Sequence, residues 1–342
     1  MVRWLREPAG DPGRIHHEGL QARVAVEEAR ESVASLVGAR SREVVFTSGA
    51  TEAIAAACWG AAERGGHQVL AAVEHSAVRR AAERHGEVTV VGVDAVGRVD
   101  PDELLAAVRD DTALVHVQWA NHEVGTCQPV AEVVARCRER GVLVHVDAAQ
   151  AVGHVPVVVE SDLLSVSAHK FGGPPGVGAL LVRRGVRLRP LLEGGDQERA
   201  RRAGFENVPA VVGFGAAAAV DVETEGAEQR RLTDRILAGV ADLAGVRVYG
   251  DAVDRAPHIV CLGVDDIEPQ AVLLGLDRRG VAAHSGSACS SEALEPSPVL
   301  EAMGVDAHRS LRLSVGWSTT DDDVDAFLAA LPEVLAELRA LR

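Results

Sequence analysis

From its amino terminus to about residue 224, the chain alternates short apolar runs with longer amphipathic stretches. The apolar runs have the length and the Val-rich composition of strands, whereas apolar positions in the intervening stretches recur with helical spacing. Strands are predicted at residues 43–47, 68–73, 87–91, 112–118, 142–146, 163–166 and 178–182. Helices are predicted at residues 18–37, 76–84, 101–108, 129–140 and 209–223. This alternation indicates an α/β fold with a mainly parallel sheet covered by helices on both faces.

The pattern changes beyond residue 224, where strands are predicted between helices at residues 246–249, 258–262, 281–284 and 310–315. A last helix with one apolar face follows Thr320, and the spacing from Thr320 to Asp323 is that of a capping box. We therefore expect a large domain at residues 15–224. A smaller α+β domain is expected at residues 225–342, together with residues 1–14.

The composition is that of a globular protein, and the net charge disfavours some classes of binding partner. With 342 residues, 47% of them hydrophobic, the chain can bury a substantial core. Acidic residues outnumber basic ones by 50 to 35, and the formal charge of −15 disfavours general binding to nucleic acid or anionic membranes. No apolar run reaches the roughly 18 residues of a membrane span, and residues 1–8 lack the hydrophobic stretch of a secretion signal. A cytoplasmic location is therefore expected.

The five cysteines predict free thiols rather than disulfides or a metal site. They are odd in number and lack the CxxC spacing of zinc ligands, so we expect no metal. Cys58 and Cys261 stand among apolar residues, as structural core cysteines do. Cys289 instead lies in the run 285–291, in which every other residue is Ser, Gly or Ala. Such a run is typical of an accessible loop.

The basic residues draw attention to Lys170. Arginine makes up 34 of the 35 basic residues, and Lys170 is the only lysine. A coding bias that replaces Lys by Arg explains the excess where charge alone matters. A lysine that survives such a bias is expected to be one whose amine is needed, because a guanidinium stays protonated and cannot form a Schiff base.

A second residue strengthens this interpretation. Asp147 directly follows an apolar run, so we expect it at the carboxyl end of a strand, where open α/β sheets bind their ligands. An Asp after a strand is most often a turn residue, and a lone Lys is usually a solvated charge. Taken together, and with the glycine-rich run 172–178 behind the lysine, Asp147 and Lys170 favour a site for pyridoxal 5′-phosphate, whose ring nitrogen pairs with a carboxylate.

At this point the chain resembles the fold-type I, class V pyridoxal-phosphate enzymes, and in particular the cysteine desulfurases of the NifS and IscS type. The resemblance covers nearly the whole chain from about Ile15. It implies further cofactor contacts: Ala50 and Thr51 in a phosphate-binding turn, Ser167 and His169 on the phosphate, His75 on the pyridine ring, Asn121 in the cofactor site, and Gln150 at the phenolic oxygen.

The same resemblance implies a reaction. The run around Cys289 resembles the loop that carries the persulfide in the IscS group, and Arg312 matches the arginine that binds the substrate carboxylate. The implied activity converts L-cysteine to L-alanine and leaves a persulfide on Cys289, while His75 manages protons near the substrate thiol. The implied partners are a protein that accepts the sulfur and a second copy of the chain in a homodimer.

Three features depart from the family pattern. Family members carry a further segment before the one that resembles residues 15–19, so the chain start is misassigned, the site is more open, or another chain completes it. Phe205 stands where the family has a Thr that binds phosphate across the dimer, and a phenyl ring cannot make that hydrogen bond. The stretch from Cys289 to Arg312 is also shorter, which affects the choice of acceptor.

Two alternatives to the desulfurase hypothesis stay open. The first is a class V enzyme of another reaction type, an aminotransferase or a β-lyase, in which Cys289 is incidental. The second is a degenerate scaffold that keeps the fold and binds a partner. The presence of Lys170, Asp147, His75, Cys289 and Arg312 in one chain weighs against complete loss of activity.

Overall fold

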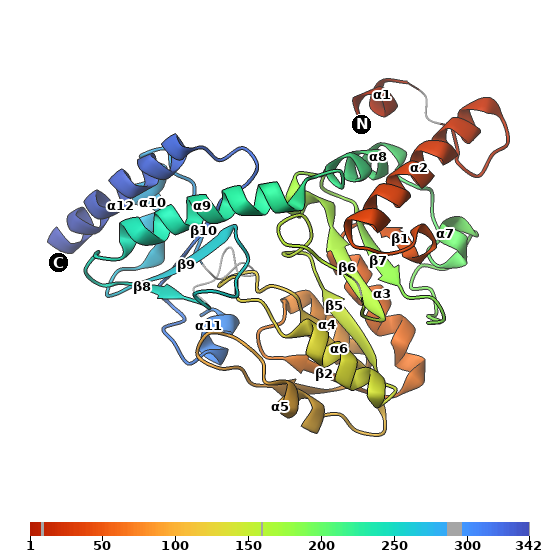
Figure 1. The fold of residues 1–342 in the computed structure, drawn as a ribbon, viewed down its shortest axis with the longest axis horizontal. Helices are drawn as coiled ribbons and strands as arrows, with labels where there is room; N and C mark the ends of the chain where they lie inside the picture. The colour runs from red at the N-terminus through yellow and green to blue at the C-terminus, as the bar shows by residue number, and fades with distance from the viewer. Residues whose placement is uncertain (8–9, 159, 286–295, 342) are drawn as a thin grey trace. The chain divides into compact units, whose positions relative to one another are not determined.

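The computed structural model describes residues 1–7, 10–158, 160–285 and 296–341, and the contacts between residues divide the chain into two compact units (Figure 1). The first unit comprises Met1–Val91, Pro101–Trp119 and Pro129–Val222. Its centre is a seven-stranded sheet in the order β1-β7-β6-β5-β4-β2-β3. The strands are β1 (Val44–Thr47), β2 (His67–Ala71), β3 (Glu87–Val91), β4 (Thr112–Gln118), β5 (Leu143–Asp147), β6 (Leu163–Ser167) and β7 (Gly178–Val182).

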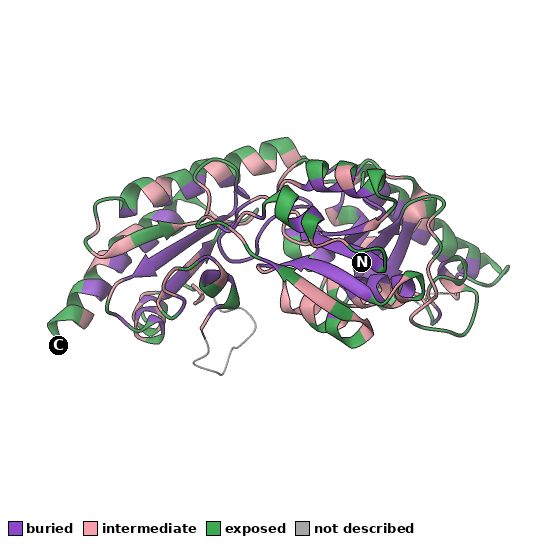
Figure 2. Cartoon of the chain, turned by 90° about the horizontal axis from the view of Figure 1, so that it is seen from below, coloured by how far each residue is buried: buried purple, intermediate pink, exposed green. Residues whose placement is uncertain are grey.

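Most of this sheet is parallel and buried on both faces. β3, β2, β4, β5 and β6 pair in parallel, whereas β7 is antiparallel to β6 and β1. Every residue of β2, β4, β6 and β7 is buried, and the central strands are purple in Figure 2. Side chains on both faces of these strands are buried, as expected for a parallel sheet with helices on both sides.

The helices of the first unit connect successive strands and cover the sheet. They are α1 (Val2–Arg6), α2 (His17–Leu36), α3 (Ala50–Ala61), α4 (Ser76–His85), α5 (Pro101–Ala106), α6 (Val130–Glu139), α7 (Gln197–Ala200) and α8 (Val208–Ala217). Short 3₁₀ turns, η1 (Ser41–Glu43), η2 (Ala62–Arg64) and η3 (Ala168–Phe171), complete the connections. Among the described residues, no helix combines the length and the apolar composition needed to cross a bilayer.

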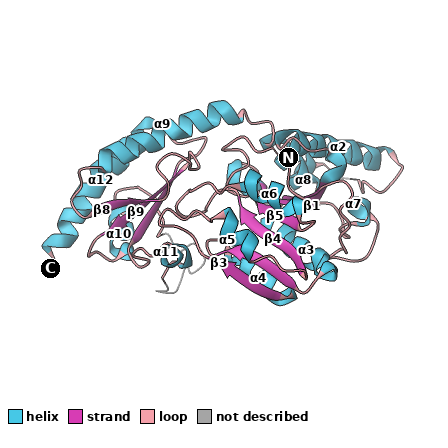
Figure 3. Cartoon of the chain, turned by 60° about the horizontal axis from the view of Figure 1, so that its bottom comes forward, coloured by secondary structure: helices cyan, strands magenta, loops and turns pink. Residues whose placement is uncertain are grey.

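The second unit comprises Gly92–Asp100, Ala120–Gln128 and Glu223–Arg342. It has a three-stranded antiparallel sheet, β10-β9-β8, with helices beside it (Figure 3). The elements are α9 (Val222–Val240), β8 (Val246–Tyr249), β9 (Ile259–Val264), α10 (Pro269–Asp277), α11 (Pro298–Ala302), β10 (Ser310–Ser314) and α12 (Asp321–Ala340). Side chains from α9, α10, α12 and the sheet form one apolar core, in which Leu262, Leu276 and Leu331 are fully buried.

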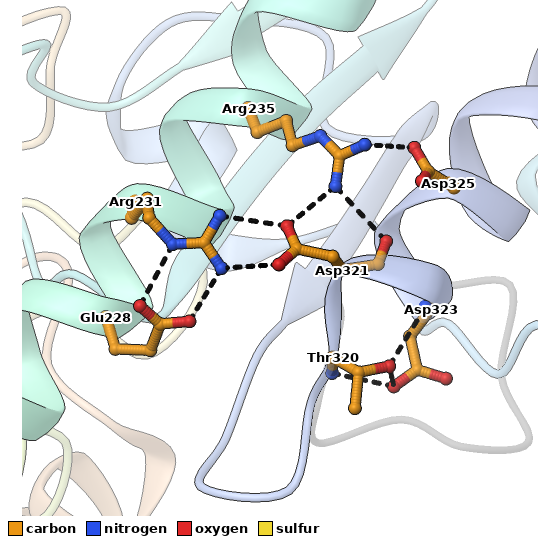
Figure 4. Close-up of polar contacts among 7 residues, drawn as sticks. All are labelled: Glu228, Arg231, Arg235, Thr320, Asp321, Asp323 and Asp325. Carbon is orange, nitrogen blue, oxygen red and sulfur yellow. Dashed lines mark hydrogen bonds and ion pairs between the residues drawn. The ribbon is translucent and has the colours of Figure 1, made fainter.

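Arginines of α9 fasten this helix to the start of α12 (Figure 4). Arg231 donates to both oxygens of Asp321, at 2.8 and 2.9 Å, and to Glu228 on its own helix. Arg235 donates to Asp321 at 2.7 Å and also to Asp325. All five side chains are partly exposed, so water and salt screen these ion pairs and each one adds little stability.

The structure confirms the α/β fold and corrects two predicted elements. The alanine-rich stretch at 209–223 is not one helix, because α8 ends at Ala217 and α9 begins at Val222. Helix propensity favours continuation through these alanines, but the contacts of the chain pass from one unit to the other at this point, and tertiary packing overrides propensity. Residues 281–284 form no strand; a single bridge joins His284 to Arg312.

The structure also differs from the expected domain boundaries. Residues 1–14 pack in the first unit rather than with the C-terminal domain, because α1 contacts α8 and the chain beside Gly10 lies against Gly19 of α2. Two loops that follow strands of the large sheet, Gly92–Asp100 and Ala120–Gln128, belong to the second unit. Sequence patterns report the order of the elements but do not show which body a connecting loop joins.

The second unit offers a stability test. Leu331 is 0% exposed, so Leu331→Ala is expected to lower the free energy of unfolding by about 2–5 kcal/mol. Asp321→Ala, which removes the exposed ion pairs of Asp321 with Arg231 and Arg235 (Figure 4), is expected to have a much smaller effect that shrinks as salt is added. Urea denaturation at low and high salt measures both. Equal losses in the two variants would contradict this division between core and surface.

Candidate active site

The parallel arrangement of β4, β5 and β6 places their carboxyl ends at one edge of the sheet. Asp147, the last residue of β5, pairs in register with Gln118 of β4 and Ser165 of β6. Its side chain accepts a hydrogen bond from the backbone N–H of Ala149 at 3.0 Å. Asp147 is 8% exposed, and this burial raises the pKa of its carboxyl, because an ion is poorly solvated there.

Lys170 lies on the turn that follows β6. It belongs to η3, and its side chain is exposed while the ring of His154 contacts its carbonyl oxygen at 2.9 Å. Gly172 ends this turn at φ 88°, a left-handed conformation that glycine adopts without strain. Lys170 acts electrostatically on Asp147, which places the lone lysine and the buried carboxylate in one electrostatic environment.

His75 is the third member of this group. It is the N-cap of α4, and its Nδ1 accepts a hydrogen bond from Ala77 N at 3.1 Å. In the neutral ring the proton therefore lies on Nε2. Burial, with the positive charge of Lys170, lowers the pKa of His75, whereas Asp147 acts in the opposite direction. His75 is consequently biased toward the neutral form.

A corner with the geometry of an anion site adjoins this group. α3 begins after Gly49, and no side chain caps its first turn. A Cβ added to Gly49 would lie 3.8 Å from Ser167 Oγ, so that hydroxyl faces the start of the helix. Ser167 Oγ lies 2.9 Å from His169 Nδ1, and Thr51 is exposed in the first turn. Free N–H groups at a helix start together with hydroxyls suit a phosphate.

Glu52 adds a carboxylate to this corner, in the first turn of α3. Its carboxylate accepts hydrogen bonds from Ser48 N at 2.9 Å and from Arg202 at 2.9 Å. Glu52 is therefore neutralised by Arg202 and does not repel an anion at the first turn. The sequence did not indicate the pair of Glu52 and Arg202, because the two residues lie 150 positions apart.

These residues fit pyridoxal phosphate. A cationic ring nitrogen would offset the cost of burying Asp147, and a phosphate would lie against the start of α3 beside Ser167. Gln150, three residues beyond Asp147, is half-buried on the same loop, and Ala50 opens α3. The predicted residues of the first unit are thus positioned by neighbouring strand ends.

Asn121 and Arg312 form a second group, in the second unit. Asn121 is fully buried, and its Oδ1 accepts hydrogen bonds from the backbone N–H groups of Glu123 and Val124, at 2.8 and 2.9 Å. Arg312 of β10 donates from Nη1 to the carbonyl oxygen of His122 at 3.0 Å. The arginine proposed for the substrate carboxylate is therefore fastened to the turn that carries Asn121.

The described thiols have no nucleophilic character. Cys58 and Cys137 are buried and Cys127 is half-buried, and burial raises the pKa of Cys58 to about 12 and of Cys127 and Cys137 to about 11. Burial also raises the pKa of Cys261. A thiolate is the reactive form, so the raised pKa values disfavour these four thiols as nucleophiles at neutral pH. Cys289 lies outside the described residues.

Sequence reasoning missed a buried polar chain two residues below the site. Ser165 Oγ lies 2.7 Å from His145 Nε2, the two Nδ1 atoms of His145 and His116 are 3.0 Å apart, and His116 Nε2 lies 2.8 Å from Gln68 Oε1. Gln68 Oε1 can only accept a hydrogen bond, which fixes the direction of donation in the whole series. Ser165 donates to His145, His145 donates to His116, and His116 donates to Gln68. Burial lowers the pKa of His145 to about 3, so the chain is uncharged.

Comparison with known proteins agrees with this geometry. The family model described as aminotransferase class-V matches residues 3–327. The chain belongs to this family. Within the class-V aminotransferase family, a cysteine desulfurase of Nostoc sp. is 44% identical over 100% of this chain and 90% of its own length. The cysteine desulfurase IscS of Methanosarcina thermophila is 41% identical over 99% of this chain and 88% of its own length.

A solved structure of this class-V fold, titled a NifS-like protein, superposes with a TM-score of 0.91 at 34% identity, covering 98% of this chain and 94% of that one. The predicted resemblance to NifS-like and IscS-like proteins of the class V family is therefore confirmed, as is the fold. The roles of the individual residues stay predictions.

The thiol pKa values generate a labelling test. At neutral pH, iodoacetamide is expected to modify Cys127 and Cys137 about a hundredfold more slowly than in the urea-unfolded protein, because each pKa unit lowers the thiolate fraction about tenfold. Cys289 is expected to react first. Peptide mass spectrometry over time measures the order, and early labelling of Cys58 or Cys261 would contradict the structure.

Proposed function

We propose that the protein is a pyridoxal-phosphate-dependent cysteine desulfurase that converts L-cysteine to L-alanine and transfers the sulfur to Cys289. The observation that carries the proposal is the group at the sheet edge: the lone lysine, a buried carboxylate and a histidine share one environment. Relatives over 40% identical across the chain are named for this activity, which supplies the substrate.

The cofactor is held by residues of the first unit. Asp147 would pair with the ring nitrogen, His75 would lie against the ring and Lys170 would bind the cofactor covalently. The phosphate is bound by the start of α3, at Ala50 and Thr51, and by Ser167 and His169, while Gln150 donates to the phenolic oxygen. When bound, pyridoxal phosphate supplies an electron sink for negative charge that develops at the substrate Cα.

Proton transfers use Lys170 and His75. Lys170 Nζ, as the free amine, would take the Cα proton of the substrate, and Lys170 is exposed on the turn after β6. His75 holds its proton on Nε2, because Nδ1 is occupied by Ala77 N. His75 would therefore act first as a hydrogen-bond donor, through Nε2. It could accept a proton only at Nδ1, and only after the hydrogen bond from Ala77 N to Nδ1 is broken. Arg312 binds the substrate carboxylate and Asn121 contributes to the same site.

The sulfur step conserves atoms and electrons. Cys289, as a thiolate, attacks the sulfur of the substrate, so an S–S bond forms while the Cβ–S bond breaks and its electron pair stays with the carbon. A proton then adds to that carbon, and the sum of the reaction is L-cysteine plus the Cys289 thiol giving L-alanine plus the Cys289 persulfide. No external oxidant is needed, because the carbon is reduced as the sulfur is oxidised. The persulfide then passes its outer sulfur to an acceptor protein.

The same proposal covers assembly and location. A homodimer is proposed, with Phe205, which is 61% exposed, in the position of the family's phosphate-binding hydroxyl. The cytoplasm is proposed as the location, since its thiols stay reduced and the four described cysteines are all free. Direct binding to nucleic acid is not part of the proposal, given the charge of −15.

The lysine gives the first test of this function. Borohydride reduction of the cofactor-loaded protein is expected to attach the cofactor to a single internal peptide, the one with Lys170, because the chain has no other lysine. Lys170→Ala is expected to abolish turnover while the phosphate corner still binds the cofactor weakly. Lys170→Arg is the matched control, since it keeps the charge without a reactive amine. Cofactor on any other peptide contradicts the assignment.

The cysteine gives the decisive test. Cys289→Ser is expected to keep the cofactor absorbance and the spectral change on adding cysteine, yet to form no persulfide and release almost no sulfide, because only that step needs the thiol. Cys127→Ser is the matched control and should keep persulfide formation. If Cys289→Ser consumes cysteine at the wild-type rate, the protein is a lyase. If the fully loaded wild type forms no persulfide, the scaffold alternative gains support.

A further inference from the structure

Glu74 joins two neighbouring strand ends of the first unit, those of β2 and β4. It follows β2 by three residues and is 5% exposed. Its Oε1 accepts a hydrogen bond from Gln118 N at 2.6 Å, and Gln118 Nε2 donates to the carbonyl oxygen of Val73 at 2.7 Å. The next amide, Trp119 N, donates to the carbonyl oxygen of Asp147 at 2.8 Å. Glu74 thus fastens the segment that carries His75 to the end of β4, and the next residue of that strand end, Trp119, bonds to Asp147 at the end of β5.

The second oxygen of this carboxyl is buried without a hydrogen bond. Glu74 Oε2 has no partner among the described residues. A buried carboxylate oxygen left bare costs far more when the group is ionised than when it is protonated. Arg79 is the cationic residue nearest to Glu74 in sequence, but it donates to the carbonyl oxygen of Ala72 and does not pair with the Glu74 carboxylate.

Asp147 adds to this cost. Burial and the negative charge of Asp147 together raise the pKa of Glu74 to about 8. The hydrogen bond from Ala149 N and the positive charge of Lys170 oppose the rise that burial causes in the pKa of Asp147, so the site favours ionisation of Asp147 over that of Glu74. Glu74 and Asp147 are both buried and repel each other when ionised, and the stabilising groups act on Asp147. The two carboxyls are therefore expected to carry a single negative charge between them.

We propose that Glu74 is held as a neutral acid and acts as a positioning residue, fastening the segment that carries His75 to the strand ends beside Asp147. Asp147 is then the only anion of the pair, and its charge is available for a cationic ring nitrogen. A neutral Glu74 also leaves the adjacent His75 uncharged. The catalytic part of this inference rests on the proposed function, whereas the protonation state of Glu74 does not.

The protonation state is tested by stability. In full-length protein of equal cofactor occupancy, the folding equilibrium constant of Glu74→Gln relative to wild type is expected to rise about tenfold or more between about pH 5 and pH 8. The reason is that wild type, with a Glu74 pKa raised from 4.5 to about 8, loses stability through this window, while the amide does not titrate. Exposed Glu83 on α4, the helix that follows Glu74, provides the control, Glu83→Gln.

Infrared spectroscopy provides an independent readout. The spectrum at neutral pH is expected to contain a protonated-carboxyl band that Glu74→Gln removes and Glu83→Gln leaves. A pH-independent difference in stability, with no band lost, overturns the proposal and means that Glu74 is ionised. The Gln side chain preserves the shape and the acceptor for Gln118 N, so loss of folding is not the expected complication.

Positioning is tested by comparison of two substitutions. Glu74→Ala removes the acceptor for Gln118 N and is expected to lower kcat for cysteine at least tenfold with the cofactor absorbance retained. Glu74→Gln is expected to restore most of this loss, because it mimics the neutral acid. Equal losses in both variants overturn the positioning role. If wild type itself fails to turn over cysteine, the proposed function fails while the stability and infrared results still decide the charge of Glu74.

Discussion

The alignment of three parallel strand ends is the constraint on which the candidate site depends. β4, β5 and β6 lie side by side in a register that sets Gln118, Asp147 and Ser165 opposite one another. A slip of one residue would turn Asp147 to the opposite face of a fully covered sheet and bury its carboxyl among apolar helices. The polar chain through His145 and His116 disfavours such a slip, because every member would lose its partner at once.

Sequence alone predicted the features that depend on local pattern. The strands of the large sheet and the capping box at Thr320 follow from periodicity and from residue preferences, and the structure confirms both, with shifts of one or two residues at the element ends. The fold class followed from the alternation of strands with helices. Asp147 and Lys170 were identified because the end of a strand is a position that sequence can indicate and because this chain contains a single lysine.

What sequence could not predict are the contacts between distant segments. The break between α8 and α9 lies at residues 218–221, which contain no Gly or Pro, and it coincides with the point where the chain passes from one unit to the other. Glu74 stood beside His75 in the sequence, but its role depends on Gln118, 44 residues away. A glutamate before a histidine is ordinarily a solvated charge. The only sequence feature that indicated burial of Glu74 was its position directly after the predicted strand at residues 68–73.

The turn at α7 shows how such a distant contact maintains an unfavourable backbone near the site. Glu198, Arg199 and Ala200 have φ values of 49°, 58° and 59°, and each left-handed non-glycine residue costs about 1–2 kcal/mol. Glu198 offsets this cost: buried Arg30 donates to both of its oxygens at 2.6 and 2.8 Å.

The arginines that follow this turn transmit its position to the candidate site. Arg199 donates to Glu27 at 2.9 Å, and Arg202 donates to Glu52 at 2.9 Å, within the first turn of α3. Loss of the Arg30 contact to Glu198 would leave a buried charge unpaired and remove what holds the strained turn, so Arg202 would no longer be fixed beside Glu52. An unpaired Glu52 would then place a negative charge at the helix start proposed to bind phosphate. The geometry of the corner proposed to bind the phosphate therefore depends on the ion pair of Arg30 with Glu198, which has no part in the proposed chemistry.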